Sequence, residues 1–346
     1  MRGGTVYIGQ KGYGKMKKRI IATLSAVLAV ILLLFTSAFA SSAADDGLKN
    51  VDGQWIYVKD GVKDTSFTSL VKYYGTWYYV ENGELNWSFT GLTDYYGTKY
   101  YVENGVLNWD YTGLALLGSD EWCYAENGAV KNDYTGLTYF CGRWFYVEKS
   151  ALNWNYTGLT NYYGTWYYVE NSILNWNFTG LTDYYGTKYY VENGVLNWDY
   201  TGLALLGSDE WYYAENGAVK NDYTGLTYFC GRWFYVEKSA LNWDFTGLTD
   251  YYGTKYYVEN GVLNWDYTGL ALFGSDKWYY AENGTVKNDY TGLVHFGDRW
   301  LYVEKSAFNR DYTGLTNYYG TWYYVEKSVL NWNYTGLTKY YDTWYY

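Results

Sequence analysis

The feature that most constrains this chain is a short motif that returns at a nearly fixed interval. Thr-Gly-Leu recurs throughout, and its glycines are always 22 or 23 residues apart. They stand at positions 91, 113, 136, 158, 180, 202, 225, 247, 269, 292, 314 and 336. A fixed period in this range is typical of repeat architectures, in which each unit buries its apolar face only against its neighbours. We therefore expect one repeat array rather than separate globular domains.

Each repeat carries the pattern of a β-hairpin. In residues 76–87 (TWYYVENGELNW), an aromatic and β-branched run is followed by Asn-Gly and a second short run. Asn-Gly supplies the positive φ angles of a type I′ turn, and aromatic residues favour strands. We expect copies with Lys-Ser here to have looser or longer loops, and residues 90–98 to connect one hairpin to the next. The sequence thus predicts an all-β solenoid of stacked β-hairpins with about 22 residues per unit, in roughly 13 units plus a truncated one.

The amino terminus has the organisation of a secretory signal. Basic residues 17–19 precede an apolar run over 20–35, and Ala38-Phe39-Ala40 supplies small residues for cleavage. The alternative is a retained anchor, because the run is near the short limit for a membrane-spanning helix. We predict residues 1–15 as an upstream start artefact, 16–40 as the signal peptide, 41–50 as a short linker and 51–346 as the β-hairpin repeat array.

The charge balance restricts the partners. Residues 1–40 contain six basic and no acidic residues, so residues 41–346 hold 20 basic and 36 acidic ones, a net charge of −16. Such a surface repels nucleic acid and anionic membranes, whose binding rests on Lys and Arg contacts to phosphate. We expect no nucleic-acid partner, and no membrane partner after signal cleavage, whereas neutral and cationic ligands are tolerated.

Strand alternation assigns the aromatic residues to two faces. The position of Tyr78 holds Leu301 in another copy, so its hydroxyl is dispensable and it is expected in the core. The position of Trp77 becomes Lys255 elsewhere, and lysine is almost never fully buried. These substitutions predict that Trp77 and Tyr79 share a face exposed to water. The candidate ligand-binding residues on this aromatic face are Trp77, Tyr79, Tyr101, Trp144, Tyr146, Trp166, Tyr168, Tyr190, Trp211, Tyr213, Trp233, Tyr235, Tyr257, Trp322 and Tyr324.

Exposed aromatic rows bind two kinds of ligand well. A quaternary ammonium lies against ring faces through cation–π attraction of about 0.5–2 kcal/mol per ring. Sugar rings lay their apolar C–H faces on Trp and Tyr. Many weak sites on one array give avidity for a polymer. The alternative is that the rings form a ladder between hairpins and bind nothing, because cross-strand aromatic pairs stabilise sheets by themselves.

The motif resembles a known family. Gly91-Leu92, Gly97-Thr98, residues 100–102 (YYV), Asn104-Gly105 and Thr112-Gly113 are similar to the cell-wall-binding repeats of Gram-positive bacteria. These include choline-binding and glucan-binding repeats and the related receptor-binding repeats of clostridial toxins. The resemblance covers residues 51–346. It implies stacked β-hairpins in a superhelical solenoid, with ligands held by aromatic residues between neighbouring hairpins.

The family commonly has a tryptophan directly after the first glycine of the motif, where it forms part of the aromatic cage. This chain has leucine there, as at Leu92 and Leu159. Additional tryptophans such as Trp87 and Trp109 either replace that cage wall or pack inside. These alternatives stay open at the level of sequence.

No catalytic or metal-binding site is expected. His295 is the only histidine, and it stands at a repeat position that holds Tyr139 in another copy. Acidic residues recur as equivalents, whereas glycosidase-type catalysis needs two carboxylates in unlike environments. The chain is therefore predicted not to be an enzyme, and to need no cofactor or metal.

These observations favour a secreted, non-catalytic repeat protein, associated with the cell surface, that binds a cell-wall polymer. Its expected partners are teichoic-acid choline or a glucan-like polysaccharide. Two alternatives remain: a structural or adhesive surface protein that binds host glycans or proteins, or a fragment of a larger secreted enzyme or toxin.

Overall fold

The computed structural model describes residues 46–346. The predicted start artefact, signal peptide and the first residues of the linker lie outside this range. The described chain forms two compact units: unit 1 comprises residues 46–111 and 127–129, and unit 2 comprises residues 112–126 and 130–346. The first strand begins at Gly47, so regular structure starts inside the segment 41–50 that we expected to be a linker.

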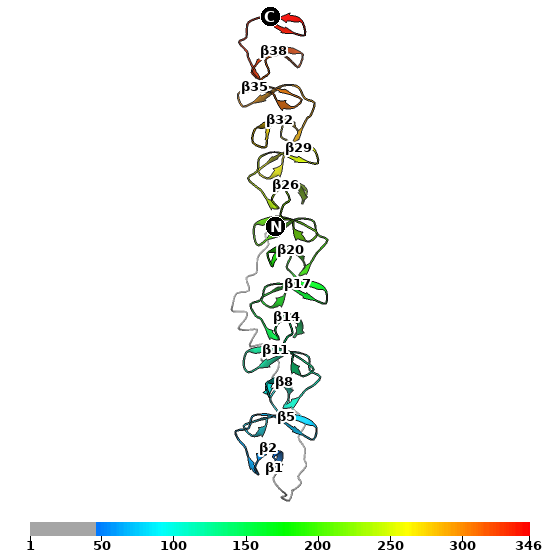
Figure 1. The fold of residues 1–346 in the computed structure, drawn as a ribbon, viewed down its shortest axis with the longest axis vertical. Helices are drawn as coiled ribbons and strands as arrows, with labels where there is room; N and C mark the ends of the chain where they lie inside the picture. The colour runs from blue at the N-terminus through cyan, green and yellow to red at the C-terminus, as the bar shows by residue number, and fades with distance from the viewer. Residues whose placement is uncertain (1–45) are drawn as a thin grey trace. The chain divides into compact units, whose positions relative to one another are not determined.

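Three strands make up a repeat, and the order recurs through both units (Figure 1). The first strands are β1 (Gly47–Val51), β4 (Ser69–Tyr73), β7 (Gly91–Tyr95), β10 (Gly113–Leu117), β13 (Gly136–Phe140), β16 (Gly158–Tyr162), β19 (Gly180–Tyr184), β22 (Gly202–Leu206), β25 (Gly225–Phe229), β28 (Gly247–Tyr251), β31 (Gly269–Phe273), β34 (Gly292–Phe296) and β37 (Gly314–Tyr318).

The second strands are β2 (Gln54–Lys59), β5 (Thr76–Glu81), β8 (Thr98–Glu103), β11 (Glu121–Glu126), β14 (Arg143–Glu148), β17 (Thr165–Glu170), β20 (Thr187–Glu192), β23 (Glu210–Glu215), β26 (Arg232–Glu237), β29 (Thr254–Glu259), β32 (Lys277–Glu282), β35 (Arg299–Glu304) and β38 (Thr321–Glu326). The short third strands are β3 (Val62–Lys63), β6 (Glu84–Leu85), β9 (Val106–Leu107), β12 (Ala129–Val130), β15 (Ala151–Leu152), β18 (Ile173–Leu174), β21 (Val195–Leu196), β24 (Ala218–Val219), β27 (Ala240–Leu241), β30 (Val262–Leu263), β33 (Thr285–Val286), β36 (Ala307–Phe308) and β39 (Val329–Leu330).

The truncated last repeat is the hairpin of β40 (Thr338–Tyr340) and β41 (Thr343–Tyr345), which forms its own two-stranded sheet. The described residues therefore contain 13 full hairpins and one partial hairpin, which confirms the predicted all-β repeat fold. Among the residues described, none forms a helix with the length and hydropathy needed to cross a lipid bilayer.

The main hairpin of each repeat lies earlier in the motif than we predicted. β7 and β8 pair from Gly91↔Val102 to Tyr95↔Thr98 around the turn Tyr96-Gly97. Residues 90–98, which we expected to be a connector, therefore supply the first strand and the turn. The sequence hid this turn because its first residue is a tyrosine with φ of 50°, a conformation that bulky residues rarely adopt. We call the Tyr-Gly turn and its equivalents the outer turn.

The Asn-Gly turn joins the second strand to the short third strand, and we call it the inner turn. Asn104 and Gly105 have φ of 51° and 75°, as a type I′ turn requires. Lys149-Ser150 adopts the same conformation, with φ of 48° and 66°. The expectation of looser or longer loops at Lys-Ser is wrong, because the third strand pairs in the same register in those copies, as at Glu148↔Ala151.

The inner turn ties each hairpin to the preceding one. The carbonyl of Gly105 accepts a hydrogen bond from the Tyr79 amide at 2.9 Å, and the Gly105 amide donates to the Phe89 carbonyl at 2.9 Å. Ser172 takes the same place in unit 2, between the Tyr146 amide and the Tyr156 carbonyl, each at 2.8 Å. A Cβ on Gly105 would lie 2.6 Å from the carbonyl oxygen of Asn86, so backbones approach closely here.

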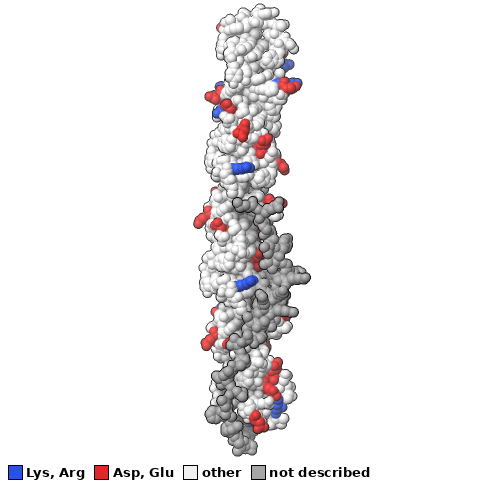
Figure 2. All heavy atoms as spheres, turned by 180° about the vertical axis from the view of Figure 1, so that it is seen from behind, with Lys and Arg blue, Asp and Glu red and all other residues white. Residues whose placement is uncertain are grey.

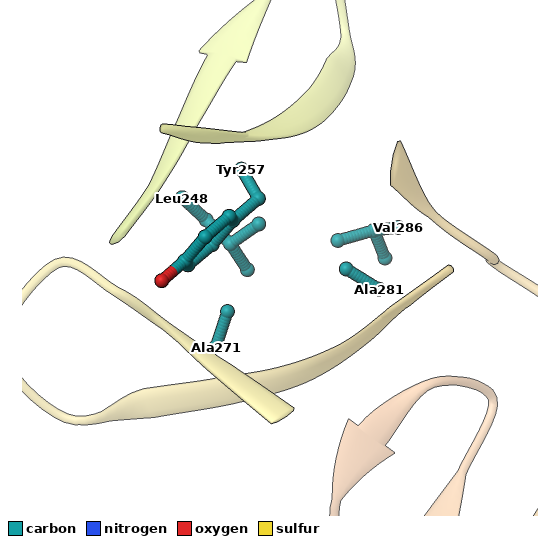
Figure 3. Close-up of a cluster of buried hydrophobic side chains, with 5 residues drawn as sticks. All are labelled: Leu248, Tyr257, Ala271, Ala281 and Val286. Atoms are coloured by element: carbon teal, nitrogen blue, oxygen red, sulfur yellow. The ribbon is translucent and has the colours of Figure 1, made fainter. Parts of the chain in front are cut away.

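The core lies between neighbouring hairpins. Each cluster combines a leucine and a tyrosine of one hairpin with apolar residues of the next, so no hairpin buries its core alone. Figure 3 shows Leu248 and Tyr257 facing Ala271, Ala281 and Val286 of the following repeat, all of them at most 8% exposed. This arrangement is the physical reason for the repeat: a hairpin separated from its neighbours exposes half of each cluster.

The predicted water-exposed face is wrong for the tyrosines. Tyr79, Tyr101, Tyr146, Tyr168, Tyr190, Tyr235 and Tyr257 are buried at 6–8% exposure, and Tyr213 and Tyr324 are half-buried. Trp77 and Tyr79 do pack against the same core cluster, as alternation predicts. Solvent access changes along the strand, however. The segment after the third strand places Phe89 directly on the Tyr79 ring at 3.9 Å, whereas Trp77 lies nearer the outer turn and stays partly exposed.

Candidate functional site

The exposed ends of the core clusters are lined by aromatic rings. In unit 1 the Trp77 ring meets Tyr95, the last residue of the next first strand, edge-on at 5.0 Å. Tyr100, in the next second strand, lies 6.5 Å from Tyr95 and packs against the same cluster. Three rings from two neighbouring hairpins thus pack against one core cluster. We call this arrangement a tryptophan junction.

The Trp77 junction opens into a pocket of about 400 Å³. Its lining includes Trp77, Tyr95, the adjacent Tyr96, Asp94 and Lys72. Oδ1 of Asp94 accepts a hydrogen bond from the Gly97 amide at 3.1 Å, which fixes the side chain at the outer turn. Nζ of Lys72 also lies 5.9 Å from the centre of the Trp77 ring. The pocket therefore combines aromatic faces with one negative and one positive charge.

The same pairing recurs in unit 2. The other predicted site tryptophans all contact the aromatic residue that ends the next first strand, or its equivalent in the truncated repeat. The pairs and centroid distances are Trp144–Tyr162 at 5.2 Å, Trp166–Tyr184 at 5.1 Å, Trp211–Phe229 at 5.3 Å, Trp233–Tyr251 at 5.3 Å and Trp322–Tyr340 at 4.6 Å. The structure thus places every tryptophan of the predicted set at a junction between hairpins.

The tyrosines of the predicted set have a structural role. Each stacks nearly parallel on an aromatic ring ten residues later, for example Tyr101 on Tyr111 at 3.6 Å and Tyr257 on Tyr267 at 3.5 Å. Burial raises the pKa of Tyr101 to about 12, with a smaller contribution from the nearby Glu103 carboxylate. These stacked rings hold neighbouring segments together and offer no face to a ligand.

The sequence analysis missed the residues that complete the junctions. Tyr95 and Tyr184 supply a wall, and the turn residues beside them, Tyr96 and Tyr185, are each 91% exposed. Tyr95 and Tyr96 lie edge-to-face at 4.6 Å. The available signal was the repeated Tyr-Tyr-Gly: a bulky residue next to glycine between two short apolar runs indicates a turn that presents aromatic side chains.

The additional tryptophans lie beside the junctions. The Trp109 ring meets Tyr100 edge-on at 5.7 Å while 51% of its own surface stays exposed. Trp176 and Trp198 take the same place in unit 2, at 5.8 Å from Tyr167 and 5.7 Å from Tyr189. They are not packed inside, so one of the two alternatives left by the sequence is excluded. Whether they act as a cage wall stays a prediction.

Charged side chains are scattered over one face of the chain. Figure 2 shows acidic side chains in small groups there, with few basic ones among them and wide uncharged areas between. Residues 46–346 contain no group of three or more His, Cys, Asp or Glu side chains that would hold a metal ion. His295 lies in β34 beside Trp300, with ring centres 5.1 Å apart, as an exposed repeat position.

Comparison with known proteins identifies the family. No curated protein matches the chain. Among solved structures, choline binding protein F from Streptococcus pneumoniae is similar at 21% identity, with 78% of this chain and 100% of that chain covered and a TM-score of 0.28. A family model described as a choline-binding repeat matches residues 46–64, 66–86, 88–108, 133–153, 155–175, 177–197, 222–242, 244–264, 266–287 and 311–331. These segments make up more than half of the residues, so the chain belongs to the choline-binding repeat family.

Proposed function

We propose that this chain is a secreted, non-catalytic protein that attaches to a bacterial cell-wall polymer by holding choline groups in its tryptophan junctions. The observation that carries the proposal is the recurring junction, as at Trp166, where the ring meets Tyr184 at 5.1 Å beside the exposed Tyr185, and where the Gly186 amide holds the Asp183 carboxylate at the outer turn. A quaternary ammonium has no hydrogen-bond donor, so ring faces and a nearby negative charge are the groups that recognise it.

The magnitudes suit a polymer better than a free small molecule. One ring contributes about 0.5–2 kcal/mol to a cation, so a junction with two or three rings binds choline weakly. Repetition changes this, because a chain of choline groups engages several junctions at once and gains avidity without new contacts. Within residues 41–346, the excess of acidic over basic residues also attracts a cationic ligand and disfavours an anionic one.

The first experiment is retention of the purified protein on a choline resin, with elution by free choline. Calorimetry with choline then counts sites in wild type and two variants. Trp166→Ala removes one junction wall and is expected to lower the number of choline molecules bound by one. Lys238→Met is the control, because Lys238 is an exposed inner-turn residue, and it should keep the wild-type count. Equal counts for both variants, or no retention of the wild type, would contradict the proposal.

A glucan-like polysaccharide is the second candidate ligand. Rows of half-exposed Trp and of exposed outer-turn Tyr favour it, because sugar rings stack on such faces. Retention on a dextran resin, lost in Trp176→Ala and kept in Trp166→Ala, would point to this ligand. Failure on both resins favours the remaining alternatives, a structural or adhesive surface protein that contacts host glycans or proteins, or a piece of a larger secreted enzyme or toxin.

A further inference from the structure

Two junctions of unit 2 have lysine in place of tryptophan, and each lysine lies over one or two rings of the next hairpin. Nζ of Lys255 is 4.9 Å from the centre of the Phe273 ring and 5.3 Å from that of Tyr279. Nζ of Lys188 is 5.3 Å from the centre of the Tyr212 ring. Phe273 and Tyr279 are the equivalents of Tyr95 and Tyr100 in the Trp77 junction. The Lys255 ammonium group therefore lies over the two rings that take the places of Tyr95 and Tyr100.

The backbone closes at the same two places. β28 and β31 pair in parallel through Leu248↔Phe273, and β19 and β22 pair through Leu181↔Leu206. Within the part of unit 2 that the structure describes, first strands of neighbouring hairpins pair at these two junctions.

The closer approach has a sequence cause. Ala271, which is 2% exposed, replaces the buried threonine of other repeats, such as Thr249. A Cβ on Gly247 would lie 2.9 Å from the Leu272 carbonyl oxygen, whereas on Gly225 its nearest neighbour would be the Tyr223 hydroxyl at 3.5 Å. Since Gly225 is a glycine as well, the smaller side chain of Ala271 is the change that accompanies the closer approach.

The outer turn changes as well. After β31 the chain passes through residues 274–276 (GSD) instead of Tyr-Gly, since Phe273 pairs with Lys277. The exposed turn tyrosine of a tryptophan junction is therefore missing, and residues 207–209 (GSD) follow β22 in the same way. Each lysine junction has lost the tryptophan and the exposed tyrosine together.

We propose that Lys188 and Lys255 are resident cations that fill their junctions from within, so that these junctions bind no external choline and hold the array together without ligand. The statement that these junctions bind no choline rests on the proposed function, whereas the statement that the two lysines are resident cations does not. Asp250, the cross-strand partner of Lys255, lies 3.9 Å from its ammonium group and balances its charge. That side chain is nearly half exposed, so the ion pair alone contributes little.

The test compares Lys255→Met, Lys255→Arg and Lys238→Met in the full chain by thermal unfolding followed by circular dichroism. Lys238→Met is the matched control, because Lys238 is an exposed inner-turn lysine of the same unit. Lys255→Met should lower the unfolding midpoint by roughly 1–4 °C relative to this control, and Lys255→Arg should not, because arginine keeps a cation on the rings. Tetramethylammonium chloride, compared with equal sodium chloride, should raise the midpoint of Lys255→Met more than that of the control.

Two results would overturn the inference. Equal midpoints for Lys255→Met and Lys238→Met would mean that the ammonium contributes nothing on the rings. A lowered midpoint that tetramethylammonium does not restore would mean that the lysine acts through packing and not as a cation. If the wild type is not retained on choline resin, the proposed function fails, while the comparison of these variants still decides whether Lys255 is a resident cation.

Discussion

Truncation of a buried tyrosine separates its structural role from a ligand-binding role. Tyr168 is 7% exposed and packs with Leu159, Val191 and Leu196 in one core cluster. Its ring lies 3.8 Å from that of Phe178 at an interplanar angle of 21°. The replacement Tyr168→Ala removes this ring from between two hairpins. If the tyrosine face bound ligand, as alternation first indicated, the variant would lose choline and keep its stability.

The structure predicts the opposite, and the magnitude follows from burial. A buried aromatic side chain removes about 150–250 Å² from water, or about 4–6 kcal/mol at about 25 cal/mol per Å² as an upper bound. The stacked pair adds about 0.5–1.5 kcal/mol. Partial collapse of the cavity recovers some of this, and truncations of buried aromatics typically cost about 3–5 kcal/mol. We expect a loss of unfolding free energy in that range.

Urea unfolding followed by circular dichroism measures this loss, with Tyr185→Ala as the control. Tyr185 is 91% exposed at an outer turn, so its truncation should change the free energy of unfolding by no more than about 0.5 kcal/mol. Because neighbouring repeats share each cluster, unfolding of Tyr168→Ala should begin at repeats 158–202, which hydrogen exchange locates. A cost below about 1 kcal/mol, or loss of choline binding at unchanged stability, would refute the assignment of Tyr168 to the core.

Three further outcomes follow from particular contacts. Burial raises the pKa of Tyr101, Tyr200 and Tyr267 to about 12. The contribution of the neutral, buried rings to the free energy of unfolding is therefore fully present below about pH 10 and is lost as pH rises toward 12. A delayed fraction of tyrosinate absorbance should therefore appear together with loss of the dichroism signal. The double replacement Lys327→Asn with Ser328→Gly should raise the free energy of unfolding by about 1–2 kcal/mol, because Ser328 Oγ is buried with no hydrogen-bond partner and both residues have positive φ; urea titration measures this gain. Tyr223→Phe should cost about 0.5–1.5 kcal/mol in the same assay, because its hydroxyl donates to the Leu226 carbonyl at 2.6 Å, and Phe178 shows that the chain tolerates the loss.

The sequence predicted the repeat, its length and its all-β class because these depend on periodicity, which every copy restates. It predicted the exposure of the site residues correctly only for the tryptophans. Strand alternation shows which residues share a face, but not how far solvent access extends along that face. Lys255 indicated water at one position of the strand, and the inference extended this to Tyr257 two residues further on. The exposure of Lys255 does not extend to Tyr257, because Tyr267 covers the Tyr257 ring while Lys255 stays only half-buried.

The motif spacing varies between 22 and 23 residues because the outer turn varies in length. Copies with a 23-residue interval carry three residues in the outer turn, as at 207–209, where other copies carry two, as at Tyr185-Gly186. Space allows this change, since nothing lies within 4 Å of a Cβ placed on Gly186. The inner turn keeps two residues in Asn-Gly and Lys-Ser copies alike, because its second residue is hydrogen-bonded to the preceding hairpin on both sides. The repeat can therefore vary its outer turn while the inner turn keeps its two residues, and the lysine junctions, each followed by a lengthened outer turn, are the places where it has done so.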